Sequence, residues 1–318
     1  MERIVFMGTP PFAVPTLEAL VTQGSYELVC VVTQPDRPAG RGRRLAAPAV
    51  KEAALAHGLP VWQPRTLRDP EAVGKLHALS PTVIVVAAFG QILSPDVLAI
   101  PPWGCLNVHA SLLPRWRGAA PIPAAILAGD EETGVTIMLL DEGMDTGPIL
   151  TQASLPIHPE DTTGSLTERL ATLGADLLIA TLPRWLAGEI QPRPQDHSQA
   201  TICRPLRKEE GWLNWSRPAI ELERRVRAYS PWPGAYTTWR GQRLKVLRAA
   251  SLMDWHGPQP PGQVIALPEG TAVATGKGAL LLLEVQLAGR RATAIADFLR
   301  GRKEFVGSHL GVLTESRA

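Results

Sequence analysis

The sequence predicts an α/β fold, an open parallel sheet covered by helices, followed by a second, smaller domain of short strands. The length of 318 residues agrees with two domains, because a domain averages roughly 150 residues. In the first two thirds of the chain, short apolar runs alternate with helical stretches, which is the pattern of βαβ units. The runs are apolar throughout, as is typical of strands covered on both faces.

The first predicted domain covers residues 1–190 and begins with an apolar strand at 3–8 and a helix at 12–23. A strand rich in β-branched residues follows at 27–33, and a helix follows at 48–57. Three more strands and a long closing helix are predicted at 82–88, 105–109, 134–140 and 164–186. In an open α/β sheet the ligand site lies at the carboxyl ends of the strands, so the residues after each strand are the place to seek it.

A polar, proline-bearing linker is predicted at 191–206, and the second domain at 207–318. This domain opens with a helix over 217–229, with Ser216 as its N-cap and Pro218 in its first turn. Five short strands are predicted at 235–240, 243–251, 262–267, 271–275 and 279–286. Short strands separated by turn signals predict a small β-barrel.

The composition excludes disordered, collagen-like and disulfide-stapled chains, since 45% of the residues are hydrophobic and 19% are charged. No apolar run approaches the ~20 residues that a membrane span needs, and no signal peptide is evident. The three cysteines, Cys30, Cys105 and Cys203, are an odd number without a CxxC pair. We therefore expect reduced thiols and a cytoplasmic protein.

The net charge of +2 is unevenly divided along the chain. Residues 1–205 carry 15 basic and 20 acidic side chains, whereas residues 206–318 carry 17 basic and 10 acidic ones. A basic second domain is expected if it binds a polyanion, although two unrelated solvated surfaces would give the same counts.

Several common catalytic motifs are absent from the sequence. The segment after the first strand, which begins at Gly8, does not complete GxGxxG, and there is no HExxH, P-loop or GxSxG. The seven histidines lack metal-ligand spacing. We therefore expect no metal site, and the zinc-hydrolase and NTPase classes lose support.

Three polar side chains follow predicted strands. Asn107 and His109 lie two residues apart at the end of a strand, so their side chains share a face. An amide donor beside an imidazole can stabilise an oxyanion and move a proton, or both can simply cap a turn. Asp145, in the turn after the next strand, can orient or deprotonate the imidazole, or be part of a solvated acidic turn.

Residues 34–45 combine four arginines with one aspartate, two glycines and two prolines. The arginines are Arg37, Arg41, Arg43 and Arg44. A flexible basic loop beside the predicted site suits a phosphate backbone, and a solvated loop without a partner would have the same composition.

Together these segments resemble the methionyl-tRNA formyltransferase family, within the wider group that uses 10-formyltetrahydrofolate. The similar stretches are 8–10, 33–42, 107–115, 141–147 and 231–235, in the family's order and at family-like intervals over nearly the whole chain. The resemblance implies a Rossmann-like formyltransferase fold and an OB-like C-terminal domain that binds tRNA.

The resemblance also implies the site residues. The family's catalytic asparagine, histidine and aspartate fall on Asn107, His109 and Asp145. Its folate-contacting residues fall on Ser111, Leu112, Leu113, Pro114, Phe89, Gly90, Gln91, Ile92, Leu93, Asp141, Glu142, Gly143 and Met144. Its tRNA-probing loop corresponds to 34–48, with Arg41 at the core and Arg37, Arg43 and Arg44 beside it.

The implied activity is transfer of the formyl group of 10-formyltetrahydrofolate to the α-amino group of methionyl-initiator-tRNA. The amine attacks directly and gives a tetrahedral intermediate, and neither a metal nor a covalent enzyme intermediate is needed. The implied partner is the acceptor stem of the initiator tRNA, and the chain is expected to act as a monomer in translation initiation.

Three alternatives stay open. A UDP-amino-sugar formyltransferase and a 10-formyltetrahydrofolate hydrolase share the three polar side chains, but the arginine loop has no evident role in either. The hydrolase is also expected in a longer chain with a dehydrogenase domain. A folate-dependent RNA-binding module without catalysis would be marked by loss of the three side chains, all of which are present.

Overall fold

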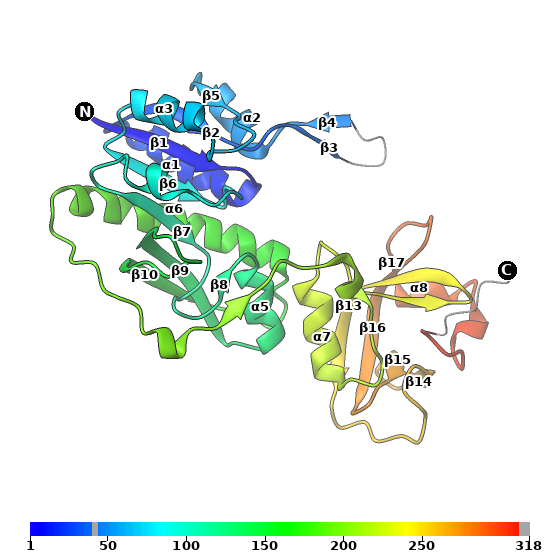
Figure 1. The fold of residues 1–318 in the computed structure, drawn as a ribbon. Helices are drawn as coiled ribbons and strands as arrows, with labels where there is room; N and C mark the ends of the chain where they lie inside the picture. Colours follow the sequence, from blue (N-terminus) through cyan, green and yellow to red (C-terminus); the bar gives the residue numbers. More distant parts are fainter. Residues whose placement is uncertain (40–43, 312–318) are drawn as a thin grey trace. The chain divides into compact units, whose positions relative to one another are not determined.

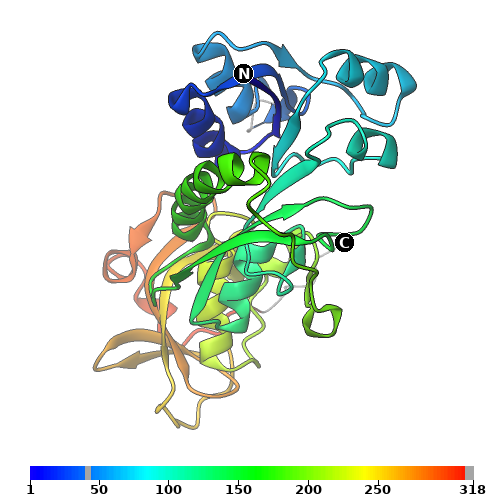
Figure 2. The ribbon, with the colours of Figure 1, turned by 90° about the vertical axis from the view of Figure 1, so that its left-hand side faces the viewer.

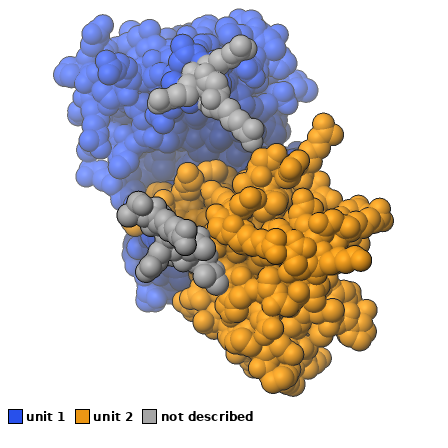
Figure 3. All heavy atoms as spheres, turned by 90° about the vertical axis from the view of Figure 1, so that its right-hand side faces the viewer, with its two compact units in different colours: residues 1–121, 132–156, 167–204 blue, residues 122–131, 157–166, 205–318 orange. Residues whose placement is uncertain are grey.

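The structure is a computed structural model that describes residues 1–39 and 44–311. The chain forms two compact units, coloured separately in Figure 3. Unit 1 comprises residues 1–121, 132–156 and 167–204, and unit 2 comprises residues 122–131, 157–166 and 205–318. The domain bounds 1–190, 191–206 and 207–318 stay a prediction.

Unit 1 contains a seven-stranded sheet in the order β10-β9-β7-β6-β1-β2-β5 (Figure 1). Its parallel strands are β1 (Glu2–Gly8), β2 (Tyr26–Val32), β5 (Val61–Trp62), β6 (Val83–Ala87) and β7 (Cys105–His109). The sheet ends in β9 (Glu132–Leu139), antiparallel to β7, and β10 (Ile149–Pro156), antiparallel to β9. A parallel-dominant Rossmann-like sheet confirms the predicted fold class.

The five predicted strands of this sheet are all present, with three differences. The fifth, β9, runs antiparallel to its neighbour, where a parallel strand was expected. Two edge strands were not predicted, because β5 has only two residues and β10 is buried only at its first two residues and does not form an apolar run.

Helices cover both faces of the sheet. They are α1 (Val14–Gln23), α2 (Ala49–Ala56), α3 (Pro70–Ala78), α4 (Pro95–Leu98), α5 (Pro121–Ala128) and α6 (Thr163–Leu186). One face packs against α3 and α4 through Val5, Met7 and Ile84, which share a core cluster with Leu76 and Val97. The long helix α6 runs along the sheet (Figure 1, Figure 2).

The segment predicted as a basic loop contains a short antiparallel ribbon, β3 (Arg37–Ala39) paired with β4 (Arg44–Ala46). The ribbon projects from the rest of unit 1 (Figure 1). The predicted linker also has regular structure: β11 (Ile202–Cys203) pairs in parallel with β8 (Arg117–Gly118). Residues 191–204 therefore belong to the framework of unit 1.

Unit 2 contains an antiparallel half-barrel in the order β12-β13-β16-β15-β14. The five predicted strands correspond to β12 (Tyr236–Trp239), β13 (Gln242–Leu252), β14 (Val264–Leu267), β15 (Gly270–Ala274) and β16 (Ala279–Leu287), and β17 (Thr293–Ala294) pairs with β16. The chain after Phe305 joins the edge strands, because Ser308 O accepts from Val264 N at 2.8 Å and Gly311 N donates to Thr238 O at 3.0 Å.

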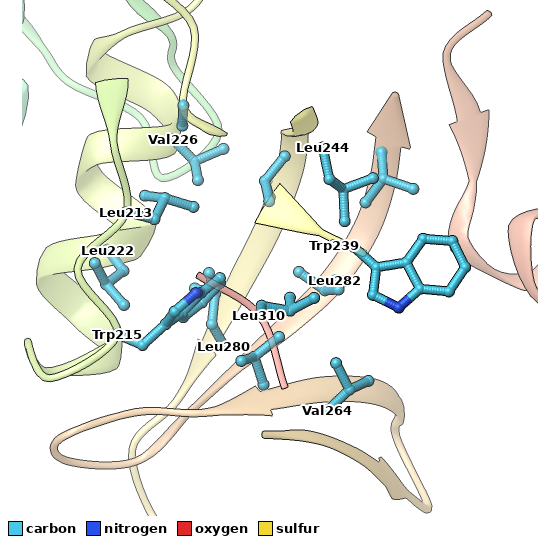
Figure 4. Packing of buried hydrophobic residues seen from close by; sticks show 14 of the residues in the cluster. Leu213, Trp215, Leu222, Val226, Trp239, Leu244, Val264, Leu280, Leu282 and Leu310 are labelled. Atoms are coloured by element: carbon cyan, nitrogen blue, oxygen red, sulfur yellow. The ribbon is translucent and has the colours of Figure 1, made fainter. Parts of the chain in front are cut away.

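The half-barrel packs on α7 (Ala219–Ala228) through Leu222 and Val226, and Trp215 and Trp239 fill the same core (Figure 4). A short helix, α8 (Ile295–Leu299), adds Phe298, whose ring packs edge-on against Trp239. The predicted N-cap of α7 was wrong: the helix begins at Ala219, with Pro218 as its N-cap residue. A proline disfavours helical dihedrals in the residue before it, which keeps Arg217 out of the helix.

None of the helices within residues 1–39 and 44–311 is long and apolar enough to cross a membrane.

Candidate active site

Asn107 and His109 project from β7, which lies between β6 and β9. Val108, between them, faces α6, where a Cβ at Gly174 would lie 2.7 Å from Val108 Cγ1. Successive side chains of a strand point to opposite faces. Asn107 and His109 therefore share the face opposite α6, as their spacing predicts.

The turn after β9 brings Asp145 to both side chains. Asn107 Nδ2 donates to Asp145 Oδ1 at 3.4 Å, and His109 Nδ1 lies 3.6 Å from Asp145 Oδ2. The His109 and Asp145 side chains are 6% and 14% exposed. The structure thus brings the three predicted side chains together in a largely buried cluster at the carboxyl end of β7.

A backbone carbonyl fixes the imidazole from its other side. His109 Nε2 lies 3.0 Å from Trp116 O, and a carbonyl oxygen can only accept, so Nε2 carries a hydrogen. That partner leaves Nδ1 facing the carboxylate. The only other proton site of the ring is therefore the nitrogen that faces Asp145.

Gly118 provides the backbone donor for the carboxylate. Its N–H donates to Asp145 Oδ2 at 2.9 Å. Gly118 lies in β8 with φ +112°, and a Cβ there would lie 2.3 Å from Cys203 O. Only glycine fits this close approach between β8 and β11.

The backbone of Asp145 is itself unusual, with φ 52° in a residue that has a side chain. Such left-handed positions cost about 1–3 kcal/mol and persist where neighbours hold them. Here Gln195 Nε2 donates to Asp145 O at 2.9 Å and to Gly147 O at 2.7 Å. The Asp145 turn is therefore held at two places: Gly118 binds its carboxylate, and Gln195 binds its backbone carbonyls.

Cys203 is buried in β11, where it pairs with Gly118 of β8. Burial raises the pKa of its thiol, and the charge of Asp145 adds to that rise. The Sγ atom donates to Arg117 O at 3.2 Å. Cys203 is thus a neutral thiol at ordinary pH, tied to the backbone that carries Gly118.

The segment Ser111 to Pro114 follows β7 directly and has largely structural contacts. Ser111 is fully buried, and its Oγ donates to Arg115 O at 2.6 Å. Leu113 N donates to Thr136 Oγ1 at 3.1 Å, and Leu113 O accepts from Gln152 Nε2 at 2.9 Å. Leu112 and Pro114 are partly exposed. The predicted folate contacts of the four residues stay predictions.

The second predicted folate segment, 89–93, lies at the carboxyl end of β6. Phe89 and Leu93 are buried, whereas Gly90 is exposed and Ile92 is 69% exposed. The Phe89 carbonyl accepts from Thr9 Oγ1 at 2.8 Å. The Gln91 side chain accepts from Leu67 N at 3.0 Å, so it anchors the loop.

The third predicted folate segment, 141–144, is exposed throughout. Asp141 accepts from Thr146 Oγ1 at 2.7 Å and from Gly143 N at 3.1 Å, which closes a tight turn. Glu142 has no ion pair among the described residues. The Met144 side chain is 61% exposed, and its Sδ atom would be 3.3 Å from a Cβ at Gly118. Met144 therefore lies beside the cluster.

Of the four predicted tRNA-binding arginines, Arg37 lies in β3 and Arg44 in β4. Arg37 is exposed and donates to Gln34 Oε1 at 3.0 Å, and Arg44 begins β4. Arg41 and Arg43 lie outside the described residues. Their role stays a prediction.

Two contributors to the site were not predicted. Trp116 contributes only a backbone carbonyl, which no side-chain motif reveals. Gln195 lies in the predicted linker, about 50 residues after Asp145. The density of polar residues in 191–199 is its only signal in the sequence, and a linker has the same composition. Nowhere in the described part of the chain do three His, Cys, Asp or Glu side chains gather as metal ligands would.

Family models cover both parts of the chain. Residues 2–182 match the model described as formyl transferase, and residues 205–303 match the formyl transferase C-terminal domain.

Curated relatives are similar over nearly their full length. A methionyl-tRNA formyltransferase of Roseiflexus sp. (strain RS-1) is 54% identical over 97% of this chain and 95% of its own. A methionyl-tRNA formyltransferase of Chloroflexus aurantiacus is 56% identical over 94% of this chain and 96% of its own.

Among solved structures, an N-formyltransferase from Helicobacter canadensis, in complex with folinic acid and dTDP-3-aminofucose, has a TM-score of 0.63. It covers 92% of this chain and all of its own, and its 16% identity shows the fold alone.

Proposed function

This chain belongs to the methionyl-tRNA formyltransferase family of one-carbon transferases, and we propose that it moves a formyl group from 10-formyltetrahydrofolate to the α-amine of methionyl-initiator-tRNA. The transfer would supply formylated initiator for the start of translation, and we propose that the protein acts in the cytoplasm. A single chain carries both the site and the basic domain, and we propose a monomer.

The meeting of Asn107, His109 and Asp145 at the end of β7 supports this activity most directly. Addition of an amine to a formyl carbon places negative charge on the formyl oxygen and leaves a proton to be removed from the nitrogen. The Asn107 amide can donate to that oxygen, an interaction worth about 3–4 kcal/mol per donor in related reactions.

His109 and Asp145 remove the proton from the attacking nitrogen and transfer it. The His109 Nε2–H is committed to Trp116 O, so exchange takes place at Nδ1, the nitrogen that faces Asp145. Asp145 stabilises a proton on the ring or accepts the amine proton through a water. The same pair then returns a proton to folate N10, so that its bond to the formyl carbon breaks.

The residues around the cluster fit a planar heterocyclic donor. Ile92 and Met144 are apolar side chains with more than half of their surface exposed, in two loops of unit 1. Met144 lies beside the cluster, and apolar side chains around a few polar groups are typical of a ligand site. When bound, the folate supplies the activated formyl group, and these two side chains would cover its ring.

The acceptor is proposed from charge. Residues 206–318 carry 17 basic against 10 acidic side chains, and 34–45 add four arginines. Both features favour a phosphate backbone over a neutral acceptor. The acceptor stem of the tRNA is the part that would reach Asp145.

A formyl-transfer assay with radiolabelled 10-formyltetrahydrofolate tests the function. Charged initiator tRNA, a nucleotide-linked amino sugar and buffer alone are supplied in parallel. Label on methionyl-tRNA supports the proposal. Label on the sugar would favour the sugar-formyltransferase alternative, and formate released to water would favour the hydrolase; either result would overturn the proposed acceptor.

A further inference from the structure

We propose that Arg117 and Gln195 form a positioning pair that holds the Asp145 carboxylate in its reactive orientation. The proposal rests on the proposed function, since it assigns these side chains a role in the same site. Neither side chain contacts Asp145's carboxylate directly; both act through the backbone.

The hydrogen bonds of the Gln195 amide are fully used. Nε2 donates to Asp145 O at 2.9 Å and Gly147 O at 2.7 Å, and Oε1 accepts from Arg117 Nε at 3.0 Å and Nη2 at 2.7 Å. Because carbonyls only accept and a guanidinium only donates, this amide has one possible orientation. Gln195 is 6% exposed, so water does not compete for these bonds.

Arg117 is a buried cation, also 6% exposed. In addition to its bonds to Gln195, Arg117 contacts His197 through Nη1, which lies 3.2 Å from His197 Nδ1. It forms no ion pair with any residue that the structure describes. A buried guanidinium whose partners are one amide oxygen and one imidazole, with no carboxylate, is costly to keep, so a functional reason is expected.

The place of Arg117 in the chain supplies that reason. Its preceding residue, Trp116, accepts the His109 hydrogen bond, and its following residue, Gly118, donates to Asp145. The Arg117 backbone therefore carries the partners of both acid–base groups. Its side chain, through Gln195, holds the other end of the Asp145 turn.

The left-handed backbone of Asp145 explains why this support matters. At φ 52° the backbone of the residue is in the left-handed region, and the Gln195 bonds to the carbonyls of 145 and 147 oppose its relaxation. A change of φ would rotate the side chain away from Gly118 N and Asn107. A shift of about 1 Å at a reacting group can cost on the order of 100-fold in rate.

The test measures kcat and KM for Gln195→Leu, which keeps the size but removes both ends of the amide. We expect kcat to fall about 10–100-fold, with little change in the KM for the folate donor or in the KM for the amine acceptor. In an Asp145→Asn background, we expect Gln195→Leu to change kcat less than about twofold, because its target is already lost. Equal losses in both backgrounds, or wild-type kcat in the folded single variant, would overturn the proposal.

Thr181→Val is the matched control. It removes a buried hydroxyl of the same unit that lies 2.6 Å from Leu177 O and from Thr151 Oγ1. Its thermal stability should fall, with kcat unchanged. If Gln195→Leu does not fold, Arg117→Lys keeps the charge but not the paired donation to one oxygen, and a smaller fall in kcat is expected.

The variants are assayed with whichever amine the wild type formylates, so a different acceptor would overturn the proposed function and leave this test intact. If the wild type formylates no amine, a crystal structure of Gln195→Leu decides. Asp145 should then leave Gly118 N; an unmoved carboxylate would contradict the positioning role.

Discussion

The backbone N–H of Gly118 donates to the carboxylate of Asp145 at 2.9 Å, closer than the 3.6 Å between that carboxylate and the His109 ring. The orientation of the acid is therefore set by a main-chain donor on β8. The imidazole is held separately, by Trp116 O. The His109 ring and the Asp145 carboxylate are thus held by backbone groups two residues apart, Trp116 just before β8 and Gly118 within it.

Replacing Gly118 tests this arrangement. Gly118→Ala would place a Cβ 2.3 Å from Cys203 O at φ +112°, so β8 must move. We expect the free energy of unfolding to fall by about 1–3 kcal/mol and kcat to fall by at least tenfold, measured by denaturant unfolding and formyl transfer. Gly188→Ala shares a positive φ of +73° without any close neighbour. It should lose some stability and keep kcat; equal kcat in both variants would contradict the assigned role.

The lowered pKa of Asp36, which lies just before β3, predicts that folding stability depends on pH. Hydrogen bonds from the Gln63 amide first, and then from Lys51, lower its pKa from 3.8. Because the folded pKa is depressed, the stabilisation is present above the unfolded pKa and is lost as the pH falls below 3.8 through the folded value. In Gln63→Leu, an NMR titration should show the Asp36 pKa rising toward 3.8. An unchanged value would mean that Gln63 does not act on this carboxylate.

The cysteines should be inert in the folded protein. Burial raises the pKa of Cys30 and Cys203, and raises that of Cys105 to about 12. The thiolate is the reactive form, so alkylation at pH 8 should be slow for all three and complete only in denaturant. Counting modified thiols by mass spectrometry checks this. Rapid modification of Cys203 would contradict its burial against the backbone.

The arginines of residues 34–45 should affect tRNA binding alone. We expect Arg41→Ala to raise the KM for tRNA and to reduce the slope of log KM against log salt by about one, with the KM for folate unchanged. Arg184→Ala, an exposed arginine paired with Glu189, is the control and should change neither. Equal weakening of both substrates by Arg41→Ala would contradict a role in tRNA binding.

Local sequence was enough to predict the central strands and the β7 pair. The apolar runs of β1, β6 and β7 are buried because helices cover both faces, and the spacing of Asn107 and His109 fixed their common face. Edge strands lack such continuous apolar runs. The two-residue β5 and the partly exposed β10 depend on neighbours in space, which local patterns do not encode.

The support of the site could not be predicted for a similar reason. Gln195 reaches the Asp145 turn only because the chain returns past β8 after α6, and Trp116 acts through its backbone. A polar, proline-bearing segment has the same composition whether it crosses solvent or lines a site. Long-range pairing decided between the two.

Single-turnover formyl transfer by Asn107→Ala and His109→Ala, with binding of both substrates measured separately, tests the central claim most directly. We predict that each variant binds methionyl-tRNA and the folate donor like the wild type and transfers formyl about 100–1,000-fold more slowly. The rate–pH profile of His109→Ala should also differ from that of the wild type. Wild-type rates, or wild-type pH dependence in a slowed His109→Ala, would show that the cluster at the end of β7 does not carry the chemistry assigned to it.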